Sequence, residues 1–219
     1  MPISELDDVE LNRLYGPWAG RTPSDAAELF SGYPGRWWIA GGWAIEAFTG
    51  VERPHSDLDL EVPRTELPLL REHLAGHLDV WTAAAGSLRP LLPQDDVHGS
   101  ADVVLPVGCG QVWVRAAGWE PWEFDILLAP ANASQWEFKR DRRITRPLED
   151  VLWQHRGLPY LRPEVQLLLK AKGLRAKDQQ DFDAAAPLLD TAAAAWLRES
   201  LARVHPGHAW LATLNSARG

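Results

Sequence analysis

The apolar and polar positions in the first part of the chain predict alternating strands and helices. Residues 37–40 form a short apolar run before two glycines, which indicates a buried strand that ends in a tight turn. Residues 43–48 have a helix-compatible composition and stop at Gly50, a typical helix end. Residues 57–62 alternate polar and apolar side chains with period two, which predicts a half-buried strand that Pro63 ends.

The same reading predicts a helix and three further strands downstream. Leucines at helical spacing in residues 66–78 indicate an amphipathic helix. Gly118 and Pro121 lie between the last two strands and predict a hairpin-like turn. The strands are expected over residues 80–84, 111–116 and 122–128.

The pattern changes after about residue 150. Pro159 and Pro163 mark a linker, and the remaining segment is read as helical. The helices are expected over residues 164–174, 179–189, 192–204 and 208–214. We therefore predict an α+β fold: a small mixed β-sheet with flanking helices over residues 1–150, and a helical domain over residues 151–219 that closes a cleft.

Composition narrows the class of protein. With 46% hydrophobic and 24% charged residues, the chain has ordinary globular values. No apolar run approaches the ~20 residues of a membrane span, and the acidic start MPISELDDVE does not resemble a secretion signal. Cys109 is the only cysteine, which excludes a disulfide framework. We expect a cytoplasmic protein with no membrane partner.

The charge balance bears on the kind of ligand. The formal net charge is −8, which disfavours nucleic acid as a partner and suits a cationic small molecule. The chain also has 12 tryptophans, an unusual number for its length. Composition leaves open whether they are core and surface anchors or line a ligand cleft.

A pair of aspartates on the predicted strand 57–62 is the first candidate for chemistry. Asp57 and Asp59 are two residues apart, so on a strand both carboxylates point to one face. Such carboxylates repel each other unless a cation lies between them, and hard cations such as magnesium prefer oxygen ligands. The alternative for an isolated D-x-D pair is a solvated strand face.

Two further features favour a metal site over a solvated strand face. Asp125 lies on another predicted strand, and if the strands are neighbours, three carboxylates converge and can hold two magnesium ions. Gly41 and Gly42 precede a predicted helix, where backbone without side chains approaches a phosphate closely and the helix start offers N–H groups.

These residues carry a family resemblance. The Gly41-Gly42 turn, the Asp57/Asp59 pair and the later Asp125 resemble the DNA polymerase β-type nucleotidyltransferases. More closely, the stretch from GGWAIEAFTG to RPHSDLDL resembles the aminoglycoside 2″-adenylyltransferases and lincosamide adenylyltransferases. The chain departs from the broader superfamily at Trp43, where many members have a serine that contacts phosphate.

The resemblance implies a reaction and a set of roles. It implies transfer of a nucleoside monophosphate, we expect AMP from ATP, to a hydroxyl, with two Mg²⁺ ions. Asp57 and Asp59 would hold both metals, and Asp125 would hold the catalytic metal and accept the substrate proton. The remaining role is phosphate contact by Gly41 and Gly42. The family motif includes Arg53 and His55, but no role follows from the motif itself. Two alternatives stay open: Arg53 binds the nucleotide and His55 orients a ligand carboxylate, or both belong to an ordinary loop.

A second stretch, from Pro163 to Phe182, resembles a lysine helix followed by an Arg…Asp-x-x-Asp element found in related nucleotidyltransferases, including AbiEii-type toxins. In this comparison Lys170 and Lys177 would contact the triphosphate as cations. The competing interpretation makes Lys170 part of a solvated helix face. For Asp178, a functional role and a helix N-cap remain open alternatives.

Other polar residues are weaker candidates. Glu61 faces either the cleft or solvent, and the sequence does not decide between them. The basic run 139–143 is short and interrupted, as is typical of a solvated face.

The acceptor is the least determined part of the prediction. The resemblance implies a small hydroxylated antibiotic. The acidic balance suits a cationic aminoglycoside, and a lincosamide stays open because tryptophans could line a less charged cleft. The alternative is a toxin-like nucleotidyltransferase that modifies tRNA or a protein. The sequence predicts neither the modified hydroxyl nor the oligomeric state.

Overall fold

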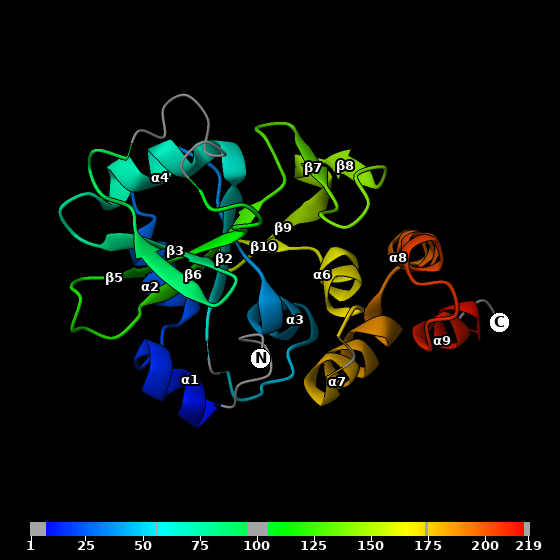
Figure 1. The fold of residues 1–219 in the computed structure, drawn as a ribbon. Coiled ribbons are helices and arrows are strands. Elements are labelled where there is room, and N and C mark those ends of the chain that lie inside the picture. The colour runs from blue at the N-terminus through cyan, green and yellow to red at the C-terminus, as the bar shows by residue number, and fades with distance from the viewer. Residues whose placement is uncertain (1–7, 56, 96–104, 174, 217–219) are drawn as a thin grey trace.

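The computed structural model describes residues 8–55, 57–95, 105–173 and 175–216. The chain folds into a mixed sheet with helices packed against it, and the C-terminal helices gather on one side of the sheet (Figure 1). The N-terminal helices are α1 (Asp8–Tyr15), α2 (Pro23–Leu29), α3 (Gly41–Thr49) and α4 (Leu67–Leu74), with the 3-10 turn η2 (Arg64–Glu66) before α4. The C-terminal helices are α6 (Pro163–Lys170), α7 (Ala176–Ala185), α8 (Thr191–Val204) and α9 (Trp210–Ser216), with η4 (Ala186–Leu188) after α7.

The strands form one large sheet and one small one. Within the described residues the large sheet has eight strands in the order β4-β3-β5-β6-β2-β1-β10-β9. In that order they are β4 (Ser87–Pro90), β3 (Asp79–Ala84), β5 (Gln111–Arg115), β6 (Phe124–Ala129), β2 (Asp59–Pro63), β1 (Trp38–Ile39), β10 (Leu158–Leu161) and β9 (Leu152–His155). The small sheet pairs β7 (Gln135–Glu137) with β8 (Thr145–Pro147), followed by the 3-10 turn η3 (Leu148–Val151).

The large sheet is mixed because two of its pairings are parallel. β2 pairs with β6 and β1 pairs with β10 in parallel, whereas its other neighbouring strands are antiparallel. The parallel pairings bring together segments that are far apart in the sequence. One of them joins the Asp59 strand to the Asp125 strand, and the other ties the C-terminal part to the first strand.

Two hydrophobic clusters hold the sheet from its two faces. Adjacent residues of a strand point to opposite faces, and β1 accordingly places Ile39 in one cluster and Trp38 in the other. The first cluster includes Leu60 and Leu67 and lies on the side of α2 and α4. The second includes Val165 and residues of α6, α7 and α8, so the helical part is fastened to the sheet by apolar burial.

The structure confirms most of the predicted elements and corrects several. The predicted strand 57–62 begins only at Asp59, so Asp57 precedes it. The segment read as a linker around Pro159 is instead a strand hairpin, and Pro163 occupies the first turn of α6. Strands β4, β7, β8, β9 and β10 were not predicted; β9 and β10 carry the large sheet beyond residue 150.

None of the helices in the described part of the chain has the length and apolar character needed to cross a bilayer.

Candidate active site

The predicted carboxylates lie where two neighbouring strands begin. β2 and β6 are parallel, and Asp59 is in register with Asp125. Residues in register on parallel strands point to the same face of a sheet. Their neighbours Leu60 and Ile126 are buried in the first cluster, so both carboxylates face the opposite side, toward the second cluster. Asp57 lies two residues before Asp59 and is exposed.

These carboxylates act on one another electrostatically. Burial, and then the charge of Asp57, raise the pKa of Asp59 to about 6. Burial, followed by the charges of Asp59 and Asp57, raises the pKa of Asp125 well above its ordinary value. Charges that are far apart in water are screened, so Asp57 lies within electrostatic reach of the two in-register aspartates. We call these three residues the carboxylate cluster.

The cluster has the donor chemistry of a magnesium site. The Oδ1 atom of Asp125 is buried and has no hydrogen-bond partner among the described residues, whereas its Oδ2 atom accepts from Gln111 Nε2 at 3.1 Å. A divalent cation would use such oxygens and relieve their repulsion. Within the described residues, however, no three Asp, Glu, His or Cys side chains are already arranged as a metal site.

The two glycines at the start of α3 make room for site residues. Gly41 has a φ of +66°, and a Cβ there would overlap the carboxylate of Asp59. A Cβ at Gly42 would overlap the guanidinium of Arg53. The N–H of Gly41 donates to Gln166 Oε1 at 2.8 Å, so this group is engaged within the chain. Phosphate contact by the glycines remains a prediction, and the geometry adds a second reason for glycine at both positions.

Arg53 and His55 hold the loop before the Asp57/Asp59 pair. Arg53 Nε lies 3.0 Å from Asp181 Oδ1, which ties the loop to α7. His55 Nε2 lies 2.7 Å from Glu46 Oε2, and its ring stacks on Trp43 with centroids 4.1 Å apart. One alternative for His55 was to orient a ligand carboxylate, and among the described residues its carboxylate partner is Glu46 of α3 instead.

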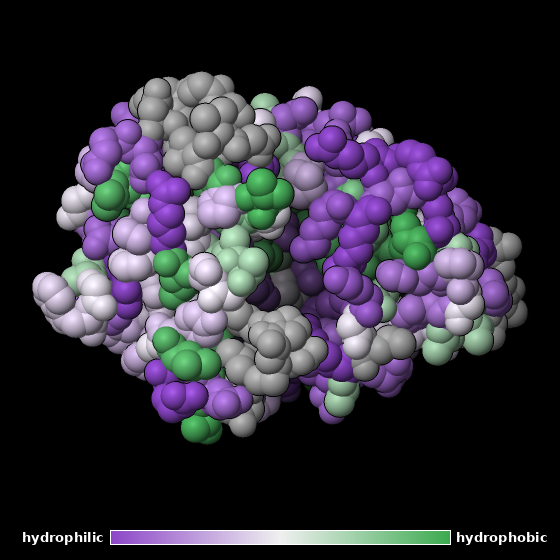
Figure 2. Space-filling view, viewed as in Figure 1, coloured by the Kyte–Doolittle hydropathy of each residue, from purple (hydrophilic) through white to green (hydrophobic). Residues whose placement is uncertain are grey.

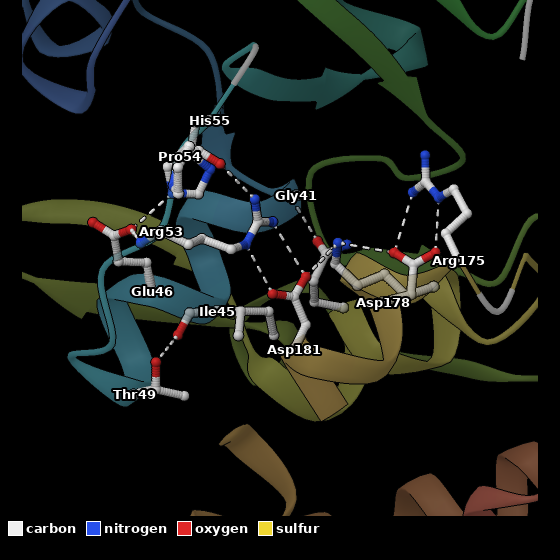
Figure 3. A network of polar contacts seen from close by, with 12 residues as sticks. Gly41, Ile45, Glu46, Thr49, Arg53, Pro54, His55, Arg175, Asp178 and Asp181 are labelled. Atoms are coloured by element: carbon white, nitrogen blue, oxygen red, sulfur yellow. Dashed lines mark hydrogen bonds and ion pairs between the residues drawn. The ribbon is translucent and has the colours of Figure 1, made fainter. Parts of the chain in front are cut away.

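Lys170 lies at the centre of a buried ion-pair network. Figure 3 shows two carboxylates of this network, Asp178 and Asp181, with the arginine that pairs with each of them. The Nζ atom of Lys170 is 2.8 Å from Asp181 Oδ2 and 3.4 Å from Asp178 Oδ1. Arg175 Nε is 2.8 Å from Asp178 Oδ2. Lys170, Asp178 and Asp181 are all buried, which rules out the solvated helix face considered for Lys170.

Asp178 does not cap α7. The N-cap position is Arg175, and Asp178 lies in the first turn of the helix. Burial opposes its charge, but hydrogen bonding from Arg175 and the charge of Lys170 together lower its pKa. Asp178 is therefore a buried anion that pairs with the two cations Lys170 and Arg175.

Two hollows adjoin the cluster, and both are lined by Asp59, Lys170 and Arg175. The loop-side hollow, of about 550 Å³, also includes Asp57, Gly42, Arg53 and Lys177. The strand-side hollow, of about 410 Å³, also includes Gly41, Glu61, Gln166, Lys139, Arg140 and Lys172. The face shown in Figure 2 is hollowed near its middle, and hydrophilic residues gather on the side of the helical part.

Sequence reasoning missed some of the lining residues. Gln166 belongs to no motif, and only its contact with Gly41 reveals it. Glu61, left undecided from the sequence, is buried and accepts from Trp38 Nε1 at 2.7 Å. Lys139 belongs to the run that we read as a solvated face; it is exposed, but it also lines the strand-side hollow.

All of the tryptophans except the exposed Trp119 are buried or half-buried. Neither hollow has a tryptophan among the described residues of its lining. Trp18, Trp113 and Trp122 instead contact one another, with ring centroids 4.9 to 6.3 Å apart. Of the two interpretations of the tryptophan content, the structure supports core and surface anchors.

Comparisons with known proteins bear on the class of enzyme. The family model described as aminoglycoside-2″-adenylyltransferase matches residues 25–87, which include Gly41, Gly42, Asp57 and Asp59. No curated protein matches the chain at a significant level.

Several solved structures resemble the chain at low identity. The lincomycin-bound lincosamide antibiotic adenylyltransferase LnuA is 14% identical, with a TM-score of 0.49 over 79% of this chain and 99% of that one. ANT(2″)-Ia in complex with adenylyl-2″-tobramycin is 15% identical, with a TM-score of 0.47 over 80% of this chain and 92% of that one. The Megavirus polyadenylate synthase is 13% identical, with a TM-score of 0.40 over 84% of this chain and 31% of that one.

The in-register aspartates of β2 and β6, beside the Gly-Gly start of α3, agree with the resemblance of the chain to the nucleotidyltransferase class. Within that class, the family match confirms over residues 25–87 the resemblance to the antibiotic adenylyltransferases that the sequence indicated.

Proposed function

We propose that the chain is a magnesium-dependent adenylyltransferase that moves AMP from ATP to a hydroxyl of a small-molecule acceptor. The observation that carries this proposal is the parallel register of Asp59 with Asp125 beside the glycines that start α3. The family match over residues 25–87 makes an aminoglycoside-type antibiotic the first acceptor to test.

Each aspartate of the cluster has an assigned role in the proposed reaction. The acceptor oxygen attacks the α-phosphorus of ATP, the bond from that phosphorus to the bridging oxygen breaks, and pyrophosphate leaves. Asp57, Asp59 and Asp125 are the residues that would hold Mg²⁺, whose charge stabilises the phosphoryl oxygens. Asp125, whose pKa burial raises, is the residue that we assign to accept the hydroxyl proton.

The loop-side hollow is the site that we assign to the triphosphate. It contains both Asp57 and Asp59, and its cations Arg53, Lys177 and Arg175 suit an anionic ligand. Lys170 also borders it, but its ammonium is already paired with Asp178 and Asp181. We therefore assign Lys170 a double role, in charge stabilisation and in holding α7 against the loop. Catalysis by such a site rests on positioning and charge stabilisation.

Pyrophosphate release tests the proposal directly. The full chain is incubated with ATP and Mg²⁺ against a panel of aminoglycosides, lincosamides, sugar phosphates and bulk tRNA. We expect release that depends on one small acceptor and falls at least 100-fold in Asp57→Ala. Asp150→Ala, at an exposed position outside both hollows, is the matched control and should retain activity.

The outcomes separate the candidates. Release with tRNA alone would favour the toxin-like alternative. Release with a small acceptor that Asp57→Ala leaves unchanged would show that the acidic cluster is not the catalytic site.

A further inference from the structure

The strand-side hollow carries more positive charge than the reaction described above uses. Five of its lining residues are cationic: Lys139, Arg140, Lys170, Lys172 and Arg175. Its acidic residues are Asp59, Glu61 and Asp178. This basic wall belongs to a chain whose formal net charge is −8, so the cations are concentrated here against the overall balance.

Ion pairing within the chain accounts for only part of this charge. Lys170 and Arg175 are both paired with Asp178. In contrast, Lys139, Arg140 and Lys172 form no ion pair with any carboxylate in the described residues. Arg140 instead donates to the carbonyl of Leu169 at 3.1 Å.

The acidic residues of the hollow do not balance those three cations. Asp59 belongs to the carboxylate cluster that we assign to Mg²⁺. Glu61 is buried, already accepts from Trp38, and offsets only one positive charge. An excess of about two positive charges is therefore left for a ligand.

The position of the strand-side hollow indicates which substrate binds next to these cations. Its lining includes Glu61 of β2 and Leu127 of β6, each two residues beyond one of the in-register aspartates and on the same face. It touches Asp59 but not Asp57, whereas the loop-side hollow touches both. If the triphosphate lies in the loop-side hollow, the strand-side hollow is the place from which a hydroxyl approaches.

From this charge and placement we infer that the acceptor is a small molecule bearing an anionic group, a phosphate or a carboxylate, held by Lys139, Arg140 and Lys172. The inference rests on the proposed adenylyl transfer and changes its acceptor class, because a polycationic aminoglycoside would be repelled by this wall. A hollow of about 410 Å³ lies within the size range of small-molecule sites. We therefore commit to a small acceptor rather than an RNA.

Binding of a probe tests the inference without knowledge of the natural acceptor. The full chain is saturated with Mg²⁺ and a non-hydrolysable ATP analogue, and the dissociation constants of glucose 6-phosphate, glucose and tobramycin are measured by calorimetry. We expect glucose 6-phosphate to bind at least tenfold more tightly than either of the others. Lys172→Glu, and independently Lys139→Glu, should remove that preference; both positions are exposed, so folding should persist.

Arg13→Glu is the matched control, because it makes the same charge change at an exposed position on α1. It should leave the preference for glucose 6-phosphate unchanged. Equal binding of glucose and glucose 6-phosphate, tighter binding of tobramycin, or a preference that survives Lys172→Glu would overturn the inference. So would pyrophosphate release with tRNA as the only acceptor.

The affinity for the ATP analogue separates this inference from the proposed function. We expect Lys177→Glu to weaken that affinity at least fivefold and Lys172→Glu to leave it within twofold. If Lys172→Glu weakens it as much as Lys177→Glu does, the strand-side hollow holds the triphosphate and the inference is wrong. If the analogue does not bind to the unmodified chain at all, the proposed adenylyl transfer fails as well.

Discussion

Replacing Gly41 with alanine would separate two requirements that meet at the start of α3. The first is conformational, because φ is +66° there and an L-residue in the left-handed region costs ~1–2 kcal/mol. The second is steric, because the added methyl group would overlap the Asp59 carboxylate and lie 3.0 Å from Asp59 Cβ. Rotating the carboxylate alone leaves the contact with Cβ, so the turn or the strand must also shift.

Gly50, at the other end of the same helix, provides a matched comparison. Its φ is +69°, and a Cβ there would meet no atom within 4 Å. Gly50→Ala should therefore show the conformational cost alone, ~1–2 kcal/mol of unfolding free energy, with activity unchanged. Gly41→Ala should lose ~2–4 kcal/mol, since the hydrogen bond to Gln166 is also disturbed.

The effect on catalysis should be larger than the effect on stability. A displacement of about 1 Å at a reacting group lowers the rate ~100-fold, which corresponds to ~2.7 kcal/mol of transition-state stabilisation. Urea unfolding and the pyrophosphate-release assay measure the two quantities on the same preparations. Equal stability losses in the two variants, together with near-normal kcat/KM in Gly41→Ala, would refute the steric argument.

Three further substitutions probe the buried polar groups. Lys170→Met should lower the unfolding free energy, measured by urea denaturation, by ~3 kcal/mol. This loss is at the low end for a broken buried ion pair, because Asp178 and Asp181 each keep an arginine partner. A loss below ~1 kcal/mol would contradict a stabilising role of the network. Burial raises the pKa of Glu61 from 4.5 to about 7, so the folded chain keeps a proton that the unfolded chain releases, and stability falls as the pH rises between these values. Glu61→Gln should remove this pH-dependent loss of stability, which amounts to up to ~3 kcal/mol between pH 4 and pH 8. Thermal unfolding at a series of pH values measures it. If the stability of the variant falls with pH as steeply as that of the unmodified chain, the prediction is wrong. Trp38→Phe removes the donor to Glu61 and should destabilise more at pH 8 than at pH 5, because the lost bond is stronger to an ionised carboxylate.

The sequence predicted the parts of the fold that local patterns encode. The period-two alternation before Pro63 and the glycines around α3 gave the strand and helix that carry the site, within two residues of their observed bounds. The short strands β9 and β10 were read as a linker, because Pro159 breaks the local pattern. Their pairing depends on contact with β1, more than a hundred residues earlier, which local periodicity does not report.

Local sequence patterns likewise predicted some residues of the candidate site and not others. The motif residues Asp57, Asp59 and Asp125 could be found because each lies in a strand-like pattern of its own. Gln166 and Glu61 could not, since a glutamine on a helix and a glutamate on a strand are usually exposed. Only the folded arrangement shows that both are buried beside the cluster.

The parallel pairing of β1 with β10 also limits how the chain can be shortened. β1 has two residues and lies between β2 and β10. A fragment ending at residue 150 would leave the outer edge of β1 without its partner and expose Trp38 and its neighbours in the second cluster. Unpaired apolar edges recruit other chains. Expression of the N-terminal part alone should therefore yield aggregates, and fragments for crystallisation or domain exchange should keep the sheet intact through Leu161.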